Sequence, residues 1–189
     1  MTIDAPSLSD AEIRRLVARL DRPIVLVGMM GVGKSTVGKK LASLLHLEFR
    51  DADEAIEEAA QMSVSEIFDR FGEAYFRDGE RRVIARLLGQ GRSVIATGGG
   101  AFAQEETREL ILEGGIAVWL DAEVDTIVER VRRKDNRPLL RGGDVREIVT
   151  RLKAERAPFY AEAPIHVASA GGPHSDTVTR ILQALARWQ

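Results

Sequence analysis

A glycine-rich segment that follows a short apolar run constrains the fold of this chain more than any other feature. It reads GMMGVGKST over residues 28–36, after four apolar residues at 24–27 and before an amphipathic run at 37–45. The spacing is G-x-x-x-x-G-K-[ST], the phosphate-binding loop (P-loop) pattern, which lies between a strand and a helix. Glycines let successive backbone N–H groups turn toward one anion, and the helix N-terminus adds partial positive charge there. The pattern predicts a nucleotide phosphate site; the alternative is a strand-to-helix turn that binds nothing.

Two side chains of this segment have the chemistry that a nucleoside triphosphate requires. Lys34 can reach the outer phosphates as a point charge, and the hydroxyl of Ser35 can ligate Mg²⁺. The predicted nucleotide-binding residues of the loop are Gly31, Val32, Gly33, Lys34, Ser35 and Thr36.

Length and composition indicate one ordinary globular domain over residues 1–189. The chain has 189 residues, 44% of them hydrophobic and 30% charged, with a formal net charge of -2 and no cysteine. Near-neutral charge argues against a general nucleic-acid or membrane-surface binder, and the lack of cysteine excludes disulfides. No apolar run approaches the roughly 18 residues that span a bilayer. The acidic N-terminal segment lacks a signal-peptide apolar block, so we expect a cytoplasmic protein.

Short apolar strands alternate with helices along the chain, which predicts a parallel sheet of five strands covered on both faces. The predicted strands are 23–28, 47–50, 93–96, 116–120 and 165–168. The predicted helices are 9–20 with Ser9 as cap and Glu12 three residues on, the run after the P-loop to about 45, 53–60, 63–71, a longer helix from a break at 72–73 to about 88, 104–112, 123–133, 144–161, and a last one capped by Asp176 and reaching 188.

Polar or glycine-rich residues follow three of the predicted strands, at 28–36, 51–53 and 97–100. Ligands of such sheets bind beyond the carboxyl ends of the strands, so we expect these segments to meet in one crevice. Asp51 and Asp53 are two residues apart, so on an extended chain both carboxylates face the phosphate site. One could support Mg²⁺ through water and the other could act as general base. The alternative is that they cap the following helix.

Four further features have both a functional and a structural interpretation. The triplet Gly98-Gly99-Gly100 is either a loop or a place where backbone approaches a ligand closely. Arg77 could form a solvated ion pair with Glu80, one helical turn later. Arg137 and Arg156 could be ordinary surface arginines.

Taken together, these segments resemble the shikimate kinases, P-loop enzymes of the nucleoside-monophosphate-kinase-like fold. The resemblance spans about residues 28–160 and keeps the family's order and spacing. It rests on GMMGVGKST (28–36), FRDAD..IE (49–57), EIF..FGEAYFRDGE (66–80), ATGGGA (96–101), NRPLL (136–140) and ERAPFY (155–160). It implies a three-layer α/β fold with a lid segment and ATP-dependent phosphorylation of the 3-hydroxyl of shikimate, toward aromatic amino acids.

On the acceptor side, the resemblance implies that Asp53 holds the substrate hydroxyls and acts as base. Arg77 and Arg156 match the arginines that hold the shikimate carboxylate, a role that suits a planar guanidinium. Glu80 matches a residue that orients Arg77, and the backbone at 98–100 matches the rest of the pocket.

On the nucleotide side, the resemblance implies that Asp51 acts near the metal through water, because no separate Walker B aspartate follows a strand. Arg137 matches an arginine of the lid, about 132–144, near the transferred phosphate. Arg130 matches a residue that stacks on adenine, and the segment at 171–173 falls where the family's adenine loop lies.

The resemblance does not cover the first 20 or so residues, for which we expect a helical extension that packs on the domain. Two rivals remain open: a kinase for gluconate or nucleotides, and a binding module that keeps the pocket without catalysis. The chain has no strong exposed apolar stripe, so we expect a monomer.

Overall fold

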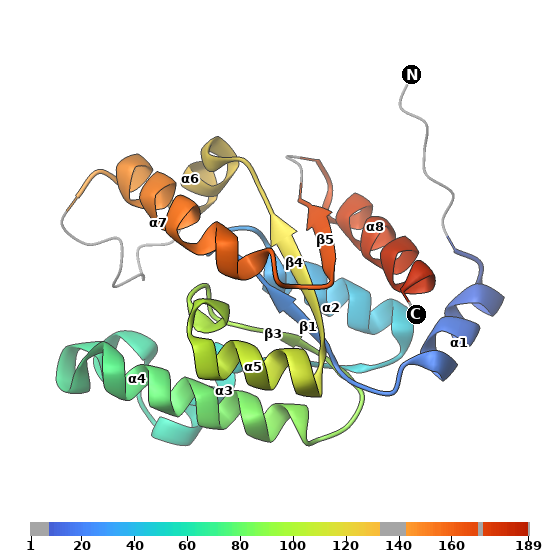
Figure 1. Cartoon of the computed structure of the whole chain (residues 1–189), viewed down its shortest axis with the longest axis horizontal. Coiled ribbons are helices and arrows are strands. Elements are labelled where there is room, and N and C mark those ends of the chain that lie inside the picture. The colour runs from blue at the N-terminus through green and yellow to red at the C-terminus, as the bar shows by residue number, and fades with distance from the viewer. Residues whose placement is uncertain (1–7, 133–142, 170–171, 189) are drawn as a thin grey trace.

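The computed structural model describes residues 8–132, 143–169 and 172–188. Its centre is a five-stranded parallel sheet of order β2-β3-β1-β4-β5, as the alternating pattern predicts (Figure 1). The strands are β1 (Ile24–Val27), β2 (Glu48–Asp51), β3 (Ser93–Ala96), β4 (Ile116–Asp121) and β5 (Ile165–Ala168). The helices in the described residues are α1 (Asp10–Arg19), α2 (Lys34–Leu45), α3 (Ala52–Ala60), α4 (Val64–Leu88), the short 3-10 turn η1 (Ala101–Ala103), α5 (Glu105–Gly114), α6 (Val124–Arg132), α7 (Val145–Tyr160) and α8 (His174–Arg187).

The sheet is covered on both faces, so its middle strands are almost wholly apolar. Figure 1 shows α1, α2 and α8 together beyond one face, and α4, α5 and α7 beyond the other. Every residue of β1 and β3 is buried. The edge strand β2 departs from the apolar pattern of the other strands: its sequence EFRD is half-buried or exposed, because it has only one neighbouring strand.

Helix starts follow the sequence signals with one exception. Ser9 and Glu12 form the predicted capping box of α1. Gly72 breaks the run inside α4, with φ 81° and ψ 174°. The prediction that Asp176 caps the last helix is wrong: Pro173 occupies the N-cap position and α8 begins at His174. Proline suits a helix start because the backbone N–H that it lacks would have no intrahelical partner there, so the helix begins before the aspartate.

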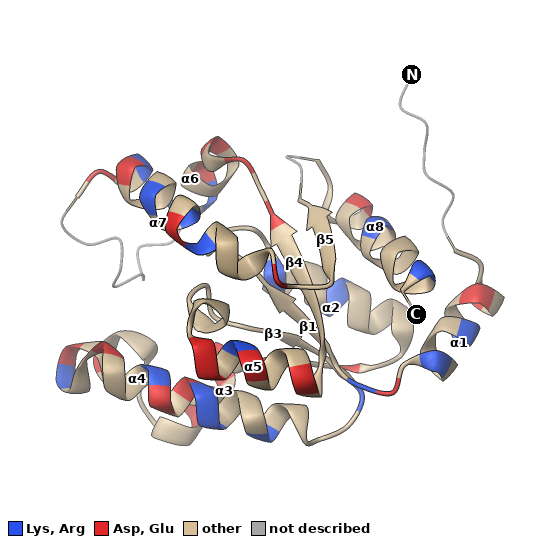
Figure 2. Cartoon of the chain, viewed as in Figure 1, with Lys and Arg blue, Asp and Glu red and all other residues tan. Residues whose placement is uncertain are grey.

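The N-terminal helix α1 packs on the body of the protein. Leu16 and Leu20 are buried, and the guanidinium of Arg19 donates to the carbonyl of Trp188 at 2.9 Å. Residues of both charge signs occur along α4, α5 and α7 (Figure 2). Within the described ranges, no helix has both the length and the apolarity to cross a membrane.

Candidate active site

The P-loop turn depends on glycines in a backbone conformation that other residues rarely adopt. Gly28, after β1, has a φ of 133°, and Gly33, at the N-cap position of α2, has a φ of 98°. A Cβ on Gly28 would overlap the carbonyl of Leu120 in β4. Both positions therefore require glycine, as the predicted anion site does.

Lys34, the first residue of α2, folds its side chain back along the loop. Its Nζ donates hydrogen bonds to the carbonyls of Gly28 and Met29, at 2.7 and 2.8 Å. The residue is only 8% exposed. The ammonium is thus held beside the loop, where phosphate oxygens can replace the two carbonyl acceptors.

Asp51 links β2 to the P-loop and to the next helix. One carboxylate oxygen accepts a hydrogen bond from the Ser35 hydroxyl at 2.7 Å, and the other accepts one from the Asp53 amide at 3.0 Å. Asp51 therefore caps α3 and also lies beside the predicted metal ligand. Mg²⁺ prefers oxygen ligands and keeps several waters, so a hydroxyl and a carboxylate oxygen this close fit the ion.

Asp53 enters the site from a helix and not from an extended strand. β2 ends at Asp51 and α3 begins at Ala52, so the prediction that both carboxylates face the same way along a strand is wrong. The reason is the Asp51 cap, which starts the helix at the next residue. Both carboxylates still line one cavity, because the first turn of α3 lies at the carboxyl end of β2.

The glycine triplet at 98–100 is packed against three parts of the site. A Cβ on its first glycine would lie 2.6 Å from Glu80 Oε1 and 3.0 Å from Asp53 Oδ1. A Cβ on the second would lie 2.8 Å from the backbone nitrogen of Met30, and one on the third would overlap the Arg77 guanidinium. The triplet is thus the common contact of α3, α4 and the P-loop, and glycine is required for that close approach.

Arg77 and Glu80 of α4 form a buried ion pair. Arg77 Nη1 donates to Glu80 Oε2 at 2.7 Å, and the side chains are 12% and 0% exposed. The interpretation as a solvated surface pair is therefore wrong, because the kinked α4 turns this face toward the triplet. Burial raises the pKa of the Glu80 carboxyl above its ordinary value, against the attraction of Arg77.

Arg156 is also buried, which rules out the surface interpretation for this arginine. It is 9% exposed, and its Nη1 donates to the carbonyl of Gly99 at 2.9 Å. Tyr160, one turn later in α7, donates its hydroxyl to the same carbonyl. The structure therefore brings α7 onto the glycine triplet.

Arg130 and His174 lie on the outer side of the P-loop. Arg130 Nη1 donates to the carbonyls of Gly31 and Val32, at 3.3 and 3.1 Å. A Cβ on Gly33 would lie 3.0 Å from the His174 ring. Burial and the nearby charge of Arg130 lower the pKa of His174, which favours the neutral form of its ring.

Most of these groups line one cavity of about 330 Å³. Arg77, Gly100 and Arg156 are not part of its wall and adjoin it through the glycine triplet. The lining residues are Met30, Gly31, Gly33, Lys34, Ser35, Thr36, Asp51, Asp53, Thr97, Gly98, Gly99, Arg130 and His174. Arg137 falls outside the described residues, as does most of the predicted lid at 132–144.

Comparison with known proteins identifies the family. The sequence model of the family described as shikimate kinase matches residues 30–186. The chain belongs to the shikimate kinase family. A shikimate kinase from Novosphingobium aromaticivorans is 64% identical over 192 residues, with both chains fully covered. One from Zymomonas mobilis subsp. mobilis is 54% identical, covering 88% of this chain and 94% of its own length.

Solved structures agree with this membership. A shikimate kinase from Acinetobacter baumannii, solved in complex with shikimate, matches with a TM-score of 0.83 and 39% identity over 86% of this chain and 91% of its own. A gluconokinase from Sinorhizobium meliloti 1021 has a TM-score of 0.57 at 18% identity over 87% and 91% of the two chains, which shows a shared fold alone. Membership carries the family's activity, which is ATP-dependent phosphorylation of shikimate in aromatic biosynthesis.

Two residues at this site, Tyr160 and His174, were not predicted from the sequence. Tyr160 belongs to the ERAPFY segment, but only the arginine of that segment carries an evident charge. His174 follows the loop at 171–173, where the pattern gives no sign that its ring reaches the P-loop. Both contacts depend on how α7 and α8 dock onto the sheet.

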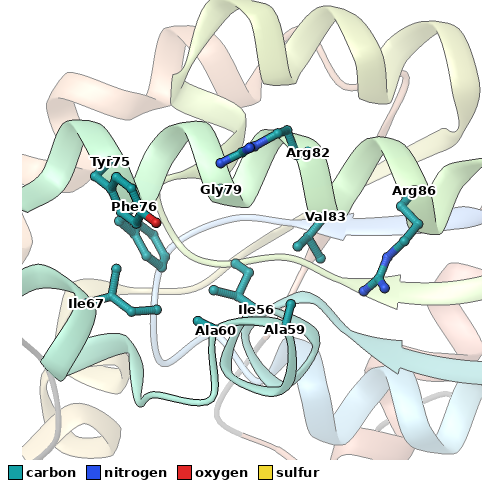
Figure 3. A pocket seen from close by; sticks show the side chains of 10 residues that line it. All are labelled: Ile56, Ala59, Ala60, Ile67, Tyr75, Phe76, Gly79, Arg82, Val83 and Arg86. Atoms are coloured by element: carbon teal, nitrogen blue, oxygen red, sulfur yellow. The ribbon is translucent and has the colours of Figure 1, made fainter. Parts of the chain in front are cut away.

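A second cavity, also about 330 Å³, lies between α3 and α4 and contains none of the predicted site residues (Figure 3). Its wall is mostly apolar, with two arginines of α4 at the rim. The lining residues are Ile56, Ala59, Ala60, Ile67, Tyr75, Phe76, Gly79, Arg82, Val83 and Arg86. The predicted chemistry therefore belongs to the P-loop cavity.

Proposed function

We propose that this site transfers the γ-phosphoryl group of ATP to the 3-hydroxyl of shikimate, with the groups of the P-loop cavity and the glycine triplet in the roles described below. The observation that carries the proposal is the position of the triplet. It touches the P-loop on one side and Asp53, Arg77 and Arg156 on the other. The donor phosphates and the acceptor therefore bind at neighbouring positions.

The donor phosphates bind at the P-loop. Lys34 and the N-terminus of α2 supply positive charge at the outer phosphates, where negative charge shifts during transfer. Arg130, held on the loop carbonyls, and His174 form the outer wall, on the side where the resemblance places adenine.

The acceptor binds on the other side of the triplet. Arg77 and Arg156 hold its carboxylate, since guanidinium groups bind carboxylates through paired hydrogen bonds. Asp53 orients the reacting hydroxyl and takes its proton as the new P–O bond forms and the bond to ADP breaks. Glu80 keeps Arg77 in place through the buried pair.

Mg²⁺ fits beside Ser35 and Asp51, whose oxygens are 2.7 Å apart. A bound Mg²⁺ would neutralise charge on the outer phosphates. Ser35 would ligate it directly, and Asp51 would act through a water molecule.

The segment at 132–144 serves as a lid that closes over the site and brings in Arg137. Closure excludes water, which would otherwise accept the phosphoryl group. We further propose that residues 1–189 form one domain with an N-terminal extension at 1–20, and that the protein is a cytoplasmic monomer without nucleic-acid or membrane partners.

The test is release of ADP from the purified protein with MgATP, measured with shikimate, with gluconate and with no acceptor. We expect release that depends on shikimate alone. Equal stimulation by gluconate would contradict the acceptor assignment. Binding of both ligands without release would favour the non-catalytic module.

A further inference from the structure

Gly99 lies between the P-loop and α7. On the α7 side its carbonyl accepts two hydrogen bonds, from the Tyr160 hydroxyl and from Arg156 Nη1 at 2.9 Å. These donors are four residues apart, and therefore lie on one face of the helix. On the other side, Gly99 lies so close to Met30 that a Cβ would be 2.8 Å from the Met30 nitrogen.

The Tyr160 ring is held rigidly, so its hydroxyl has a fixed place. The residue is 1% exposed. The ring stacks against Phe102, with centroids 6.4 Å apart and an interplanar angle of 13°. It also stacks against Trp119, at 5.8 Å and 28°. Burial raises the pKa of Tyr160 to about 12, so the hydroxyl remains a proton donor at neutral pH.

A carbonyl oxygen has two lone pairs, and both on Gly99 are used by α7. Without the tyrosine hydroxyl, the carbonyl would depend on Arg156 alone. The guanidinium would then be drawn toward the carbonyl and away from an acceptor carboxylate. The hydroxyl thus satisfies the backbone carbonyl beside the Arg156 guanidinium, with which it also interacts.

We propose that Tyr160 is a positioning residue for the acceptor pocket, whose hydroxyl fixes the Gly99 carbonyl and thereby the triplet backbone and the guanidinium of Arg156. The proposal rests on the proposed function, which assigns the triplet and Arg156 to the acceptor. Tyr160 itself does not touch the reacting atoms.

The experiment compares Tyr160→Phe with Tyr75→Phe. The chain has two tyrosines, and Tyr75 is 52% exposed, so the second variant removes a hydroxyl from outside the site. For Tyr160→Phe we expect KM for shikimate to rise about five- to tenfold, the effect of losing one buried hydrogen bond. Because the ring stack is kept, kcat and KM for ATP should stay within about twofold. Tyr75→Phe should match the wild type.

An unchanged KM for shikimate would overturn the proposal, and so would an equal loss in both KM values, which a general packing defect produces. Arg77→Ala separates this failure from failure of the proposed function. If it raises KM for shikimate while Tyr160→Phe does not, only the tyrosine proposal falls. If neither variant affects shikimate, the acceptor assignment falls as well.

A second measurement does not require Tyr160→Phe to fold. Incorporation of 3-fluorotyrosine into the Tyr75→Phe protein leaves one labelled site, at Tyr160. We expect shikimate to shift its ¹⁹F resonance, and MgADP alone to shift it much less. A resonance that does not respond to shikimate would overturn the proposal.

Discussion

The phosphate side of this active site takes most of its groups from one stretch of nine residues, 28–36, whereas the acceptor side takes them from α3, α4, α7 and the end of β3. A contiguous loop can be set by local backbone requirements, such as the positive φ of Gly33. The acceptor side forms only when helices that are distant in the sequence dock on the glycine triplet. Substitutions on the two sides should therefore have separable effects: on phosphoryl transfer for the first, and on shikimate affinity for the second.

The largest effect is expected for Lys34→Ala. Loss of the loop ammonium should lower kcat/KM by roughly 10³-fold or more, because a preorganised charge at the transferred group is among the largest catalytic contributions. ADP release measures it, with Lys39→Ala on the exposed side of α2 as control. A change confined to KM for shikimate would contradict the expectation that phosphate-side substitutions affect phosphoryl transfer.

Asp53→Asn should lower kcat by about 10²- to 10³-fold, since an amide keeps the shape but cannot take the proton. Glu54→Gln, an exposed neighbour in the same helical turn, is the control. Near-normal turnover by the folded variant would refute the base role. Asp53 lies on the acceptor side but takes part in the transfer itself, so this variant is the expected exception to the separation of effects.

Arg77→Ala should raise KM for shikimate by roughly 10- to 100-fold with KM for ATP unchanged, since it removes one partner of a buried ionic contact. It also leaves Glu80 buried without its cation and should destabilise the fold. The double variant Arg77→Ala/Glu80→Gln removes that charge. If its melting temperature recovers while KM stays high, the carboxylate role stands; if KM recovers too, the role was structural.

Ser35→Ala should raise the Mg²⁺ concentration needed for half-maximal rate by about tenfold, the scale of losing a metal-site partner. Ser43→Ala, exposed on the same helix, is the control. A Mg²⁺ titration of ADP release measures the shift. An unchanged Mg²⁺ requirement would show that Ser35 is not a metal ligand.

The last prediction concerns the stability of the fold at alkaline pH and expects no change at neutral pH. Because Tyr160 has a pKa of about 12 when folded and 10.0 as its ordinary value, the unfolded chain binds fewer protons between these values. Stability should therefore fall as pH rises from 10 toward 12, by at most about 2.7 kcal/mol. Urea unfolding across this range should show a steeper decline for the wild type than for Tyr160→Phe. Parallel declines would contradict the assignment to Tyr160.

The sequence by itself predicted the P-loop, the order of the elements and the family resemblance. These depend on patterns contained within single segments: glycine spacing, apolar periodicity and helix caps such as Ser9. The five parallel strands and the Gly72 break are confirmed for that reason. The rule that residues two apart face the same way holds only within a strand, and Asp51 and Asp53 lie on either side of the boundary between β2 and α3. The geometry predicted for them was therefore wrong, although both residues do line the cavity.

Tertiary structure alone decided which charges are buried and what they face. Arg77 and Glu80 have the spacing of a surface pair, and only the docking of α4 on the triplet removes them from water. Tyr160 and His174 reach the site through contacts with residues far away in the sequence. No local pattern encodes such contacts, because desolvation and long-range packing arise only when the helices close around the carboxyl ends of the strands.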